Sequence, residues 1–221
     1  MSTPRGDSAT ASAYDVVAAD YARALPDDGY EAPLDRAMIA DFAERVRLSG
    51  GRRVVDAGSG AGRMAPVLAG HGLRYVGADL SPGMVGVARA LHPDRHFVVG
   101  ALEELPLADH SGDGILAWYS IIHISPDALP AVFGEFRRIL RPGGSLLLGF
   151  QAGRGERTVG RAYGHAIDLT AHLHEPVAVQ QQLADLGFSI DATLVRAPRP
   201  TERNPQAMIL AGSHGAGGSG P

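Results

Sequence analysis

The sequence has 221 residues, of which 45% are hydrophobic and 20% charged, and its formal net charge is -4. This composition is typical of a globular protein with one sizeable core, and the acidic balance argues against nucleic acid as the main partner. Cysteine is absent, which excludes disulfides and metal or iron–sulfur sites held by thiolates. No apolar run reaches the roughly 18 residues that span a bilayer, and the N-terminus lacks the apolar core of a signal peptide. We therefore expect a soluble, cytoplasmic protein without a membrane partner.

The N-terminal segment predicts a polar tail followed by two helices. Residues 1–10 are polar and are expected to be disordered. The pattern that follows puts four side chains on one helical face: Tyr14, Val17, Ala18 and Tyr21. A turn at residues 26–29 leads into an amphipathic helix over about residues 34–48.

From Arg53 onward, strand-like runs alternate with helical patterns, which predicts a doubly wound α/β domain with a largely parallel sheet. Seven strands are expected at about residues 53–57, 74–79, 95–99, 113–119, 145–150, 189–196 and 206–211, and helices at about 61–71, 82–91, 126–140 and 175–187. The Pro-rich turn at 197–200 is short enough for the last two strands to form an antiparallel hairpin. We expect one domain over residues 11–211 and a disordered tail at 212–221.

A glycine-rich corner follows the first of these strands. Asp56 is followed by glycine at every second position, at Gly58, Gly60 and Gly62. Such a corner lets a ligand approach bare backbone next to a helix N-terminus. Asp79 ends the second strand about twenty residues further on, the spacing at which α/β nucleotide-binding sheets place a carboxylate for a ribose. The alternative is an ordinary strand–turn–helix corner without a ligand.

At these residues the chain resembles the class I S-adenosylmethionine (SAM) methyltransferases, whose first motif is an acid followed by G-x-G-x-G. A dinucleotide fingerprint would need glycine at position 63, where this chain has Arg63. SAM carries a sulfonium and an ammonium that an acid such as Asp56 would attract. The resemblance extends to Arg141-Pro142-Gly143-Gly144 and implies a Rossmann-like fold with an N-terminal helical lid.

The resemblance also implies roles for individual residues. The methionine part of SAM would lie on the glycine corner with Arg63 near its carboxylate, Asp79 would bind the ribose, and Leu80 would pack on the adenine. In the segment that follows the third strand, this chain has Ala101 where the family has an aspartate for the adenine amino group. The cofactor-binding residues implied in this way are Tyr14, Tyr21, Asp56, Gly58, Ser59, Gly60, Gly62, Arg63, Asp79, Leu80, Ala101, Leu102, Glu103, Trp118 and Tyr119.

Methyl transfer to a hydroxyl requires a base, and histidine suits that task near neutral pH. His123, just after the fourth strand, is the candidate base and a candidate substrate-binding residue; the alternative is a helix-capping or core histidine. The long connection over about 151–175 predicts a substrate lid, in which Tyr163 and His165 are candidate substrate-binding residues. Asp168, His172 and His174 match no strong metal signature, so we predict no metal site.

The sequence thus predicts an enzyme that transfers a methyl group from SAM to a small molecule, at oxygen or nitrogen. The motif after the fourth strand is not that of enzymes that methylate exocyclic amines of nucleic acids, so no nucleic acid partner is expected. A homodimer stays open. Two other functions remain as alternatives: a nicotinamide-dependent oxidoreductase and a non-catalytic SAM-binding protein.

Overall fold

The computed structural model describes residues 4–213, with side chains from residue 9 onward. A seven-stranded sheet forms its centre, in the order β3-β2-β1-β4-β5-β9-β8. The strands are β1 (Arg53–Ala57), β2 (Arg74–Asp79), β3 (His96–Val99), β4 (Gly112–Trp118), β5 (Leu140–Gln151), β8 (Phe188–Arg196) and β9 (Gln206–Ser213). The first five are parallel, whereas β9 runs antiparallel to both β5 and β8. The predicted doubly wound sheet with a C-terminal antiparallel hairpin is confirmed.

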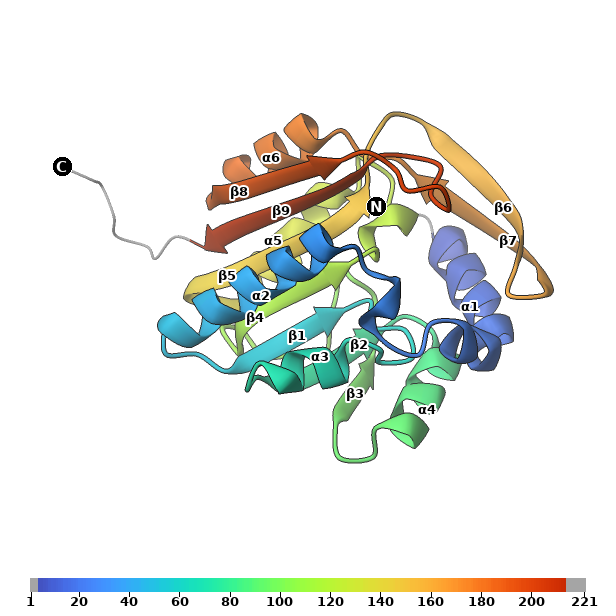
Figure 1. Cartoon of the computed structure of the whole chain (residues 1–221), viewed down its shortest axis with the longest axis horizontal. Coiled ribbons are helices and arrows are strands. Elements are labelled where there is room, and N and C mark those ends of the chain that lie inside the picture. Colours follow the sequence, from blue (N-terminus) through green and yellow to red (C-terminus); the bar gives the residue numbers. More distant parts are fainter. Residues whose placement is uncertain (1–3, 214–221) are drawn as a thin grey trace.

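Helices cover both faces of this sheet (Figure 1). They are α2 (Pro33–Leu48), α3 (Ala65–Gly70), α4 (Pro82–Leu91), α5 (Leu129–Ile139) and α6 (Pro176–Asp185), with short 3-10 turns η1 (Asp28–Tyr30) and η2 (Ile121–His123). Neighbouring strand residues face opposite cores: Val55 packs with Phe133 and Phe136 of α5, and Val54 packs with Phe42 of α2. Burial on both faces explains why the strands are continuously apolar.

Three local differences from the sequence prediction stand out. Helix α1 (Pro4–Ala24) begins at Pro4, so residues 4–10 are helical and not disordered; residues 1–3 and 214–221 of the predicted tails lie outside the described residues. Helix α3 begins at Ala65, because the glycine corner extends through Met64 as a turn. Residues 141–144, expected to break the chain before β5, form a bulge inside it, where pairing with β4 jumps from Leu140 to Ser145.

The largest difference is a second, two-stranded sheet within the predicted lid. Strands β6 (Glu156–Ala162) and β7 (His165–His172) form an antiparallel hairpin, although the sequence predicted a loop there. Its residues alternate between partly buried and exposed without a continuous apolar run, which is why the pattern resembled a polar loop. Figure 1 shows this hairpin beside α1, at the end of the sheet where β1 and β4 terminate.

A buried ion cluster ties α2 to the C-terminal hairpin. Arg196 at the end of β8 makes a bidentate contact with Asp35, its Nε and Nη2 donating over 2.6 and 2.7 Å. Arg196 also contacts Glu202, over 2.6 and 2.8 Å, in the connection between β8 and β9. Because Asp35 is fully buried, these bonds compensate its desolvation.

We expect Arg196→Ala to lower the free energy of unfolding by about 3 kcal/mol, because it leaves the buried Asp35 carboxylate without its cation. Arg45 is the matched control, since it also contacts two aspartates, Asp41 and Asp191, but is 38% exposed. Arg45→Ala should cost no more than about 0.5 kcal/mol. Urea denaturation of both variants measures the difference, and equal losses would contradict this role of the cluster.

Candidate functional site

One cavity of about 440 Å³ opens at the carboxyl ends of β1 and β4. In the strand order β2-β1-β4-β5 this is the switch point, where doubly wound sheets bind their ligands. Helix α1, the loops after β1 to β4, the hairpin and the connection between β8 and β9 contribute to its wall. Fourteen predicted residues line it: Tyr14, Tyr21, Gly58, Gly60, Arg63, Asp79, Leu80, Ala101, Leu102, Glu103, Trp118, Tyr119, His123 and Tyr163.

The glycine corner has a backbone that other residues rarely adopt. Gly58, Gly60 and Gly62 have φ values of 81°, 54° and 82°. A Cβ on Gly58 would lie 2.2 Å from Cβ of Ser120, so only glycine fits there. The backbone N–H groups of Gly58 and Ser59 both donate to the carbonyl of Ala78, over 2.8 and 2.9 Å, which fixes the corner against β2.

Asp79 joins the same corner to the end of β2. Its Oδ2 accepts a bond of 2.7 Å from the backbone N–H of Gly60, and its Oδ1 accepts one of 2.9 Å from Ser81. The backbone of Leu80 also bonds to this carboxylate, which can still accept a bond from a ligand. Burial raises the pKa of Asp79, while these backbone bonds act in the opposite direction.

Asp56 was predicted to contact the cofactor, but its side chain does not line the cavity. Its side chain is 1% exposed, and its Oδ2 accepts a hydrogen bond of 2.7 Å from the Tyr75 hydroxyl. Burial raises the pKa of Asp56 to about 7. The Asp56 carboxyl therefore bonds to a residue of β2 inside the fold and is not part of the cavity wall.

Ser59 and Gly62 are likewise turned away from the cavity wall. Ser59 is 6% exposed, and a Cβ on Gly62 would meet the Phe97 ring at 2.8 Å. Both residues therefore shape the corner through its backbone and its packing. Their predicted contact with the cofactor is not seen in the geometry.

Arg63 lies on the wall but is already paired. Its Nη1 donates to Oε1 of Glu31 over 2.5 Å, and both side chains are largely buried. Glu31 also lines the cavity and was not predicted. Thirty-two residues separate the two side chains, so no local pattern connects them.

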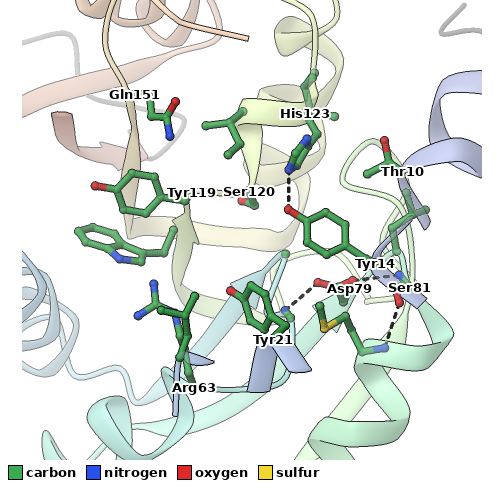
Figure 2. Close-up of a pocket in the computed structure, with 18 of the residues that line it drawn as sticks. Thr10, Tyr14, Tyr21, Arg63, Asp79, Ser81, Tyr119, Ser120, His123 and Gln151 are labelled. Atoms are coloured by element: carbon green, nitrogen blue, oxygen red, sulfur yellow. Dashed lines mark hydrogen bonds between the residues drawn. The ribbon is translucent and has the colours of Figure 1, made fainter. Parts of the chain in front are cut away.

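His123 is held by hydrogen bonds at both ring nitrogens. Nδ1 lies 2.9 Å from the carbonyl oxygen of Thr170 in β7, and Nε2 lies 2.7 Å from the Tyr14 hydroxyl (Figure 2). A carbonyl only accepts, so the proton is assigned to Nδ1, and Nε2 accepts from Tyr14. Burial lowers the pKa of His123, and the charge of the nearby Arg157 adds to this effect. His123 is therefore neutral near pH 7.

Tyrosine rings from α1 and the hairpin meet over the cavity. The Tyr21 ring lies edge-on to the rings of Tyr14 and Tyr163, with centroids 6.3 and 5.1 Å apart. His165, predicted to face a substrate, does not line the cavity. Its Nε2 lies 2.7 Å from Oδ2 of Asp20, so it fastens the hairpin to α1.

Several lining residues escaped the sequence analysis because they lie outside the expected motifs. Ser120, Gln151 and Arg157 have buried polar atoms without a hydrogen-bond partner in the described part of the chain. The further unpredicted residues on the wall include Thr10, Met84, Tyr30, Arg199, Thr201, Glu202 and Arg203. Ser120, Ser81 and Gln151 could have been found from their positions at or just after the ends of strands.

Two further findings bear on the predictions of partners. Among residues 4–213, no group of three or more His, Cys, Asp or Glu side chains gathers as a metal site would require. Within the same range, no helix combines the length and the apolar character needed to cross a bilayer.

Comparisons with known proteins agree with this geometry. Residues 55–148 match the family model described as a methyltransferase domain. A malonyl-[acyl-carrier protein] O-methyltransferase of Serratia marcescens is 32% identical over 131 residues, which are 58% of this chain and 51% of that protein. The chain thus spans about half the length of the curated relatives it matches.

Solved methyltransferase structures share the fold over nearly the whole chain. The magnesium protoporphyrin IX methyltransferase of Synechocystis PCC 6803, crystallised with bound SAM, has a TM-score of 0.70 at 19% identity and covers 96% of this chain and 99% of its own. The 1,6-didemethyltoxoflavin-N1-methyltransferase of Burkholderia thailandensis has a TM-score of 0.64 at 21% identity and covers 97% and 92%.

The raised pKa of Asp56 predicts a pH-dependent stability. The native state holds the Asp56 proton up to about pH 7, whereas the unfolded chain releases it near pH 4, so this group's contribution falls as pH rises between these values. Asp56→Asn should therefore gain about 2 kcal/mol relative to the wild type between pH 5 and pH 8. Urea denaturation at both pH values measures this, with the exposed Asp41→Asn as control. A constant difference between Asp56→Asn and the wild type would contradict the burial of a carboxyl proton.

Proposed function

We propose that this chain, which carries a class I SAM-dependent methyltransferase domain, transfers a methyl group from SAM to an oxygen or nitrogen of a small molecule. The domain match at residues 55–148 supports the reaction class. The single observation that carries the proposal is the cavity, whose wall joins the glycine corner and Asp79 to a neutral histidine.

The residues of this cavity fit SAM. Asp79 lines the cavity and would accept a bond from the ribose, and the glycine corner presents bare backbone to the methionine part. Ser120 carries a buried hydroxyl without a partner among the described residues, which the polar end of methionine would satisfy. Arg63 would face the methionine carboxylate, with Glu31 beside it as a counter-charge for the ammonium.

The adenine would lie against the loops after β2 and β3. Leu80, Ala101, Leu102 and Glu103 all line the cavity there. Ala101 has no polar side chain, so the adenine amino group would be bound by Glu103 or by water. Thr10 of α1 lines the same cavity (Figure 2) and adds a hydroxyl that the sequence motif did not indicate.

A small acceptor is favoured by the size and cover of the cavity. Its volume of about 440 Å³ lies at the lower end of the range of about 300–1,000 Å³ usual for small-molecule sites. Helix α1 and the hairpin contribute residues to its wall, as expected of a cover over a small-molecule site. The related Burkholderia enzyme acts on a small nitrogen acceptor by its name, and the Serratia enzyme on an oxygen.

SAM supplies an electrophilic methyl group on its sulfonium, and the protein positions the acceptor and removes its proton. Neutral His123 has its Nε2 lone pair directed at the Tyr14 hydroxyl. An acceptor hydroxyl would give its proton to Tyr14 as Tyr14 gives its own to His123, so that the net result is a protonated His123. Burial keeps the pKa of Tyr14 far above its ordinary value, so Tyr14 would act as a proton relay and not as a phenolate.

The alternative functions predict different behaviour. A nicotinamide dinucleotide would bring its pyrophosphate to a corner where Glu31 and Asp79 already place carboxylates, which disfavours it. A non-catalytic SAM-binding protein would bind the cofactor but turn nothing over. Cofactor binding and turnover are therefore tested separately.

Asp79→Asn should weaken binding of S-adenosylhomocysteine by about 10- to 100-fold, because it replaces a charged double acceptor with a neutral amide. Isothermal calorimetry with S-adenosylhomocysteine and with NAD measures both affinities. Asp94→Asn, an exposed aspartate in the turn before β3, is the control and should bind like the wild type. Binding of NAD alone by the wild-type chain would refute the proposal.

His123→Gln should reduce kcat by about 100-fold or more on a hydroxyl acceptor, because glutamine cannot take the proton. Release of S-adenosylhomocysteine over a panel of phenols, carboxylic acids and amines measures turnover. Because the pKa of His123 is lowered from 6.5, the wild-type rate should decline only at pH values below that. Tyr14→Phe should also lose rate, whereas the exposed His96→Gln should not. Full activity of His123→Gln with an unchanged pH profile would exclude His123 as the base.

A further inference from the structure

One arginine on the inner face of the hairpin has no evident structural function. Arg157 of β6 pairs with Ala171 of β7, and cross-strand partners point to the same face of a hairpin. Ala171 is 1% exposed, so this is the face that packs inward. The next pair on that face, Val159 and Leu169, is apolar.

Arg157 differs from Arg63 and Arg199 of the cavity wall in lacking a partner, and from Arg203, which is exposed, in being partly buried. Arg63 contacts Glu31, and Arg199 contacts Glu202 and the carbonyl of Tyr30. Nε of Arg157, in contrast, is buried without a hydrogen-bond partner, and no carboxylate lies within ion-pair distance of it among the described residues. Its neighbour Glu156 points to the opposite face, where it contacts His172.

An unpaired cation in this position is costly unless a ligand satisfies it. A buried donor left without an acceptor costs the full desolvation of that group. The Nε edge of a guanidinium presents two parallel N–H groups that match the two oxygens of a carboxylate. The position of Arg157 thus suits the binding of an anionic group.

Arg157 shares the cavity wall with the candidate base His123 and its tyrosine partner Tyr14. The charge of Arg157 also acts on His123 and Tyr14, which places it at the acceptor side of the cavity. One guanidinium with neutral neighbours suits a singly charged carboxylate better than a phosphate dianion.

We propose that the methyl acceptor carries a carboxylate, and that Arg157 binds this carboxylate and so selects acidic over neutral acceptors. The inference rests on the proposed function and adds the chemical class of the acceptor to it. Arg157 is then a specificity-determining residue contributed by the hairpin.

The test compares carboxylic acids with their primary amides as ligands. Benzoate, 4-hydroxybenzoate, hexanoate and succinate, each with its amide, are titrated into the wild-type protein with and without saturating S-adenosylhomocysteine. At least one acid should bind about tenfold or more tightly than its amide, as a charge-assisted bidentate contact predicts. In Arg157→Gln the affinity for that acid should fall to that of the amide.

Arg161→Gln is the matched control on the same strand, since Arg161 is exposed and donates only to the carbonyl of Gly164. It should keep the preference for the acid. Because Arg157 has no protein partner, Arg157→Gln should unfold at no lower temperature than the wild type, so loss of the preference cannot reflect unfolding.

The outcomes separate this inference from the proposed function. Acids that bind no tighter than amides, or a preference that survives in Arg157→Gln, would overturn the role of Arg157. Failure to bind S-adenosylhomocysteine would overturn the proposed function instead, while titrations without it still report on Arg157.

Discussion

The geometry of the site depends on the hydrogen bond of 2.7 Å between the backbone N–H of Gly60 and the Asp79 carboxylate. It joins the corner after β1 to the end of β2, and two bonds to the carbonyl of Ala78 complete the connection. A left-handed glycine backbone has no side chains to hold its shape, so the neighbouring strand must hold it. The same carboxylate remains available to a ligand, which links the stability of the corner to binding.

Helix α1 covers the cavity through polar contacts with three different elements. Asp15 accepts from Ser81 and Gly83 at the start of α4, Tyr14 donates to His123 in η2, and Asp20 contacts His165 in the hairpin. The cover and the candidate base are thus one hydrogen-bonded unit. An acceptor that reaches Tyr14 would meet a histidine whose tautomer is already set by the carbonyl of Thr170.

Burial decides which of the carboxyl groups near the cavity can act on a ligand. Asp56, expected to attract a cationic donor directly, is buried with a pKa of about 7 and bonds to Tyr75. Asp79, Glu31 and Glu103 line the proposed cofactor side, while Arg157 lines the proposed acceptor side without an ion-pair partner among the described residues. This separation would suit a cationic methyl donor and an anionic acceptor, each beside the opposite charge.

The sequence by itself determined the sheet, its two-sided burial and the glycine corner, because strand alternation, turn glycines and a strand-ending acid are local patterns. Fourteen of the predicted site residues lie on the cavity wall for the same reason. Only the tertiary structure decided which face Asp56 takes, because a strand buried on both sides gives no polar alternation to read. It also decided the pairing of Tyr14 with His123, 109 residues apart, and the placement of Arg157 by a hairpin that resembled a loop. Such contacts arise from the packing of distant elements, and no local backbone preference encodes them.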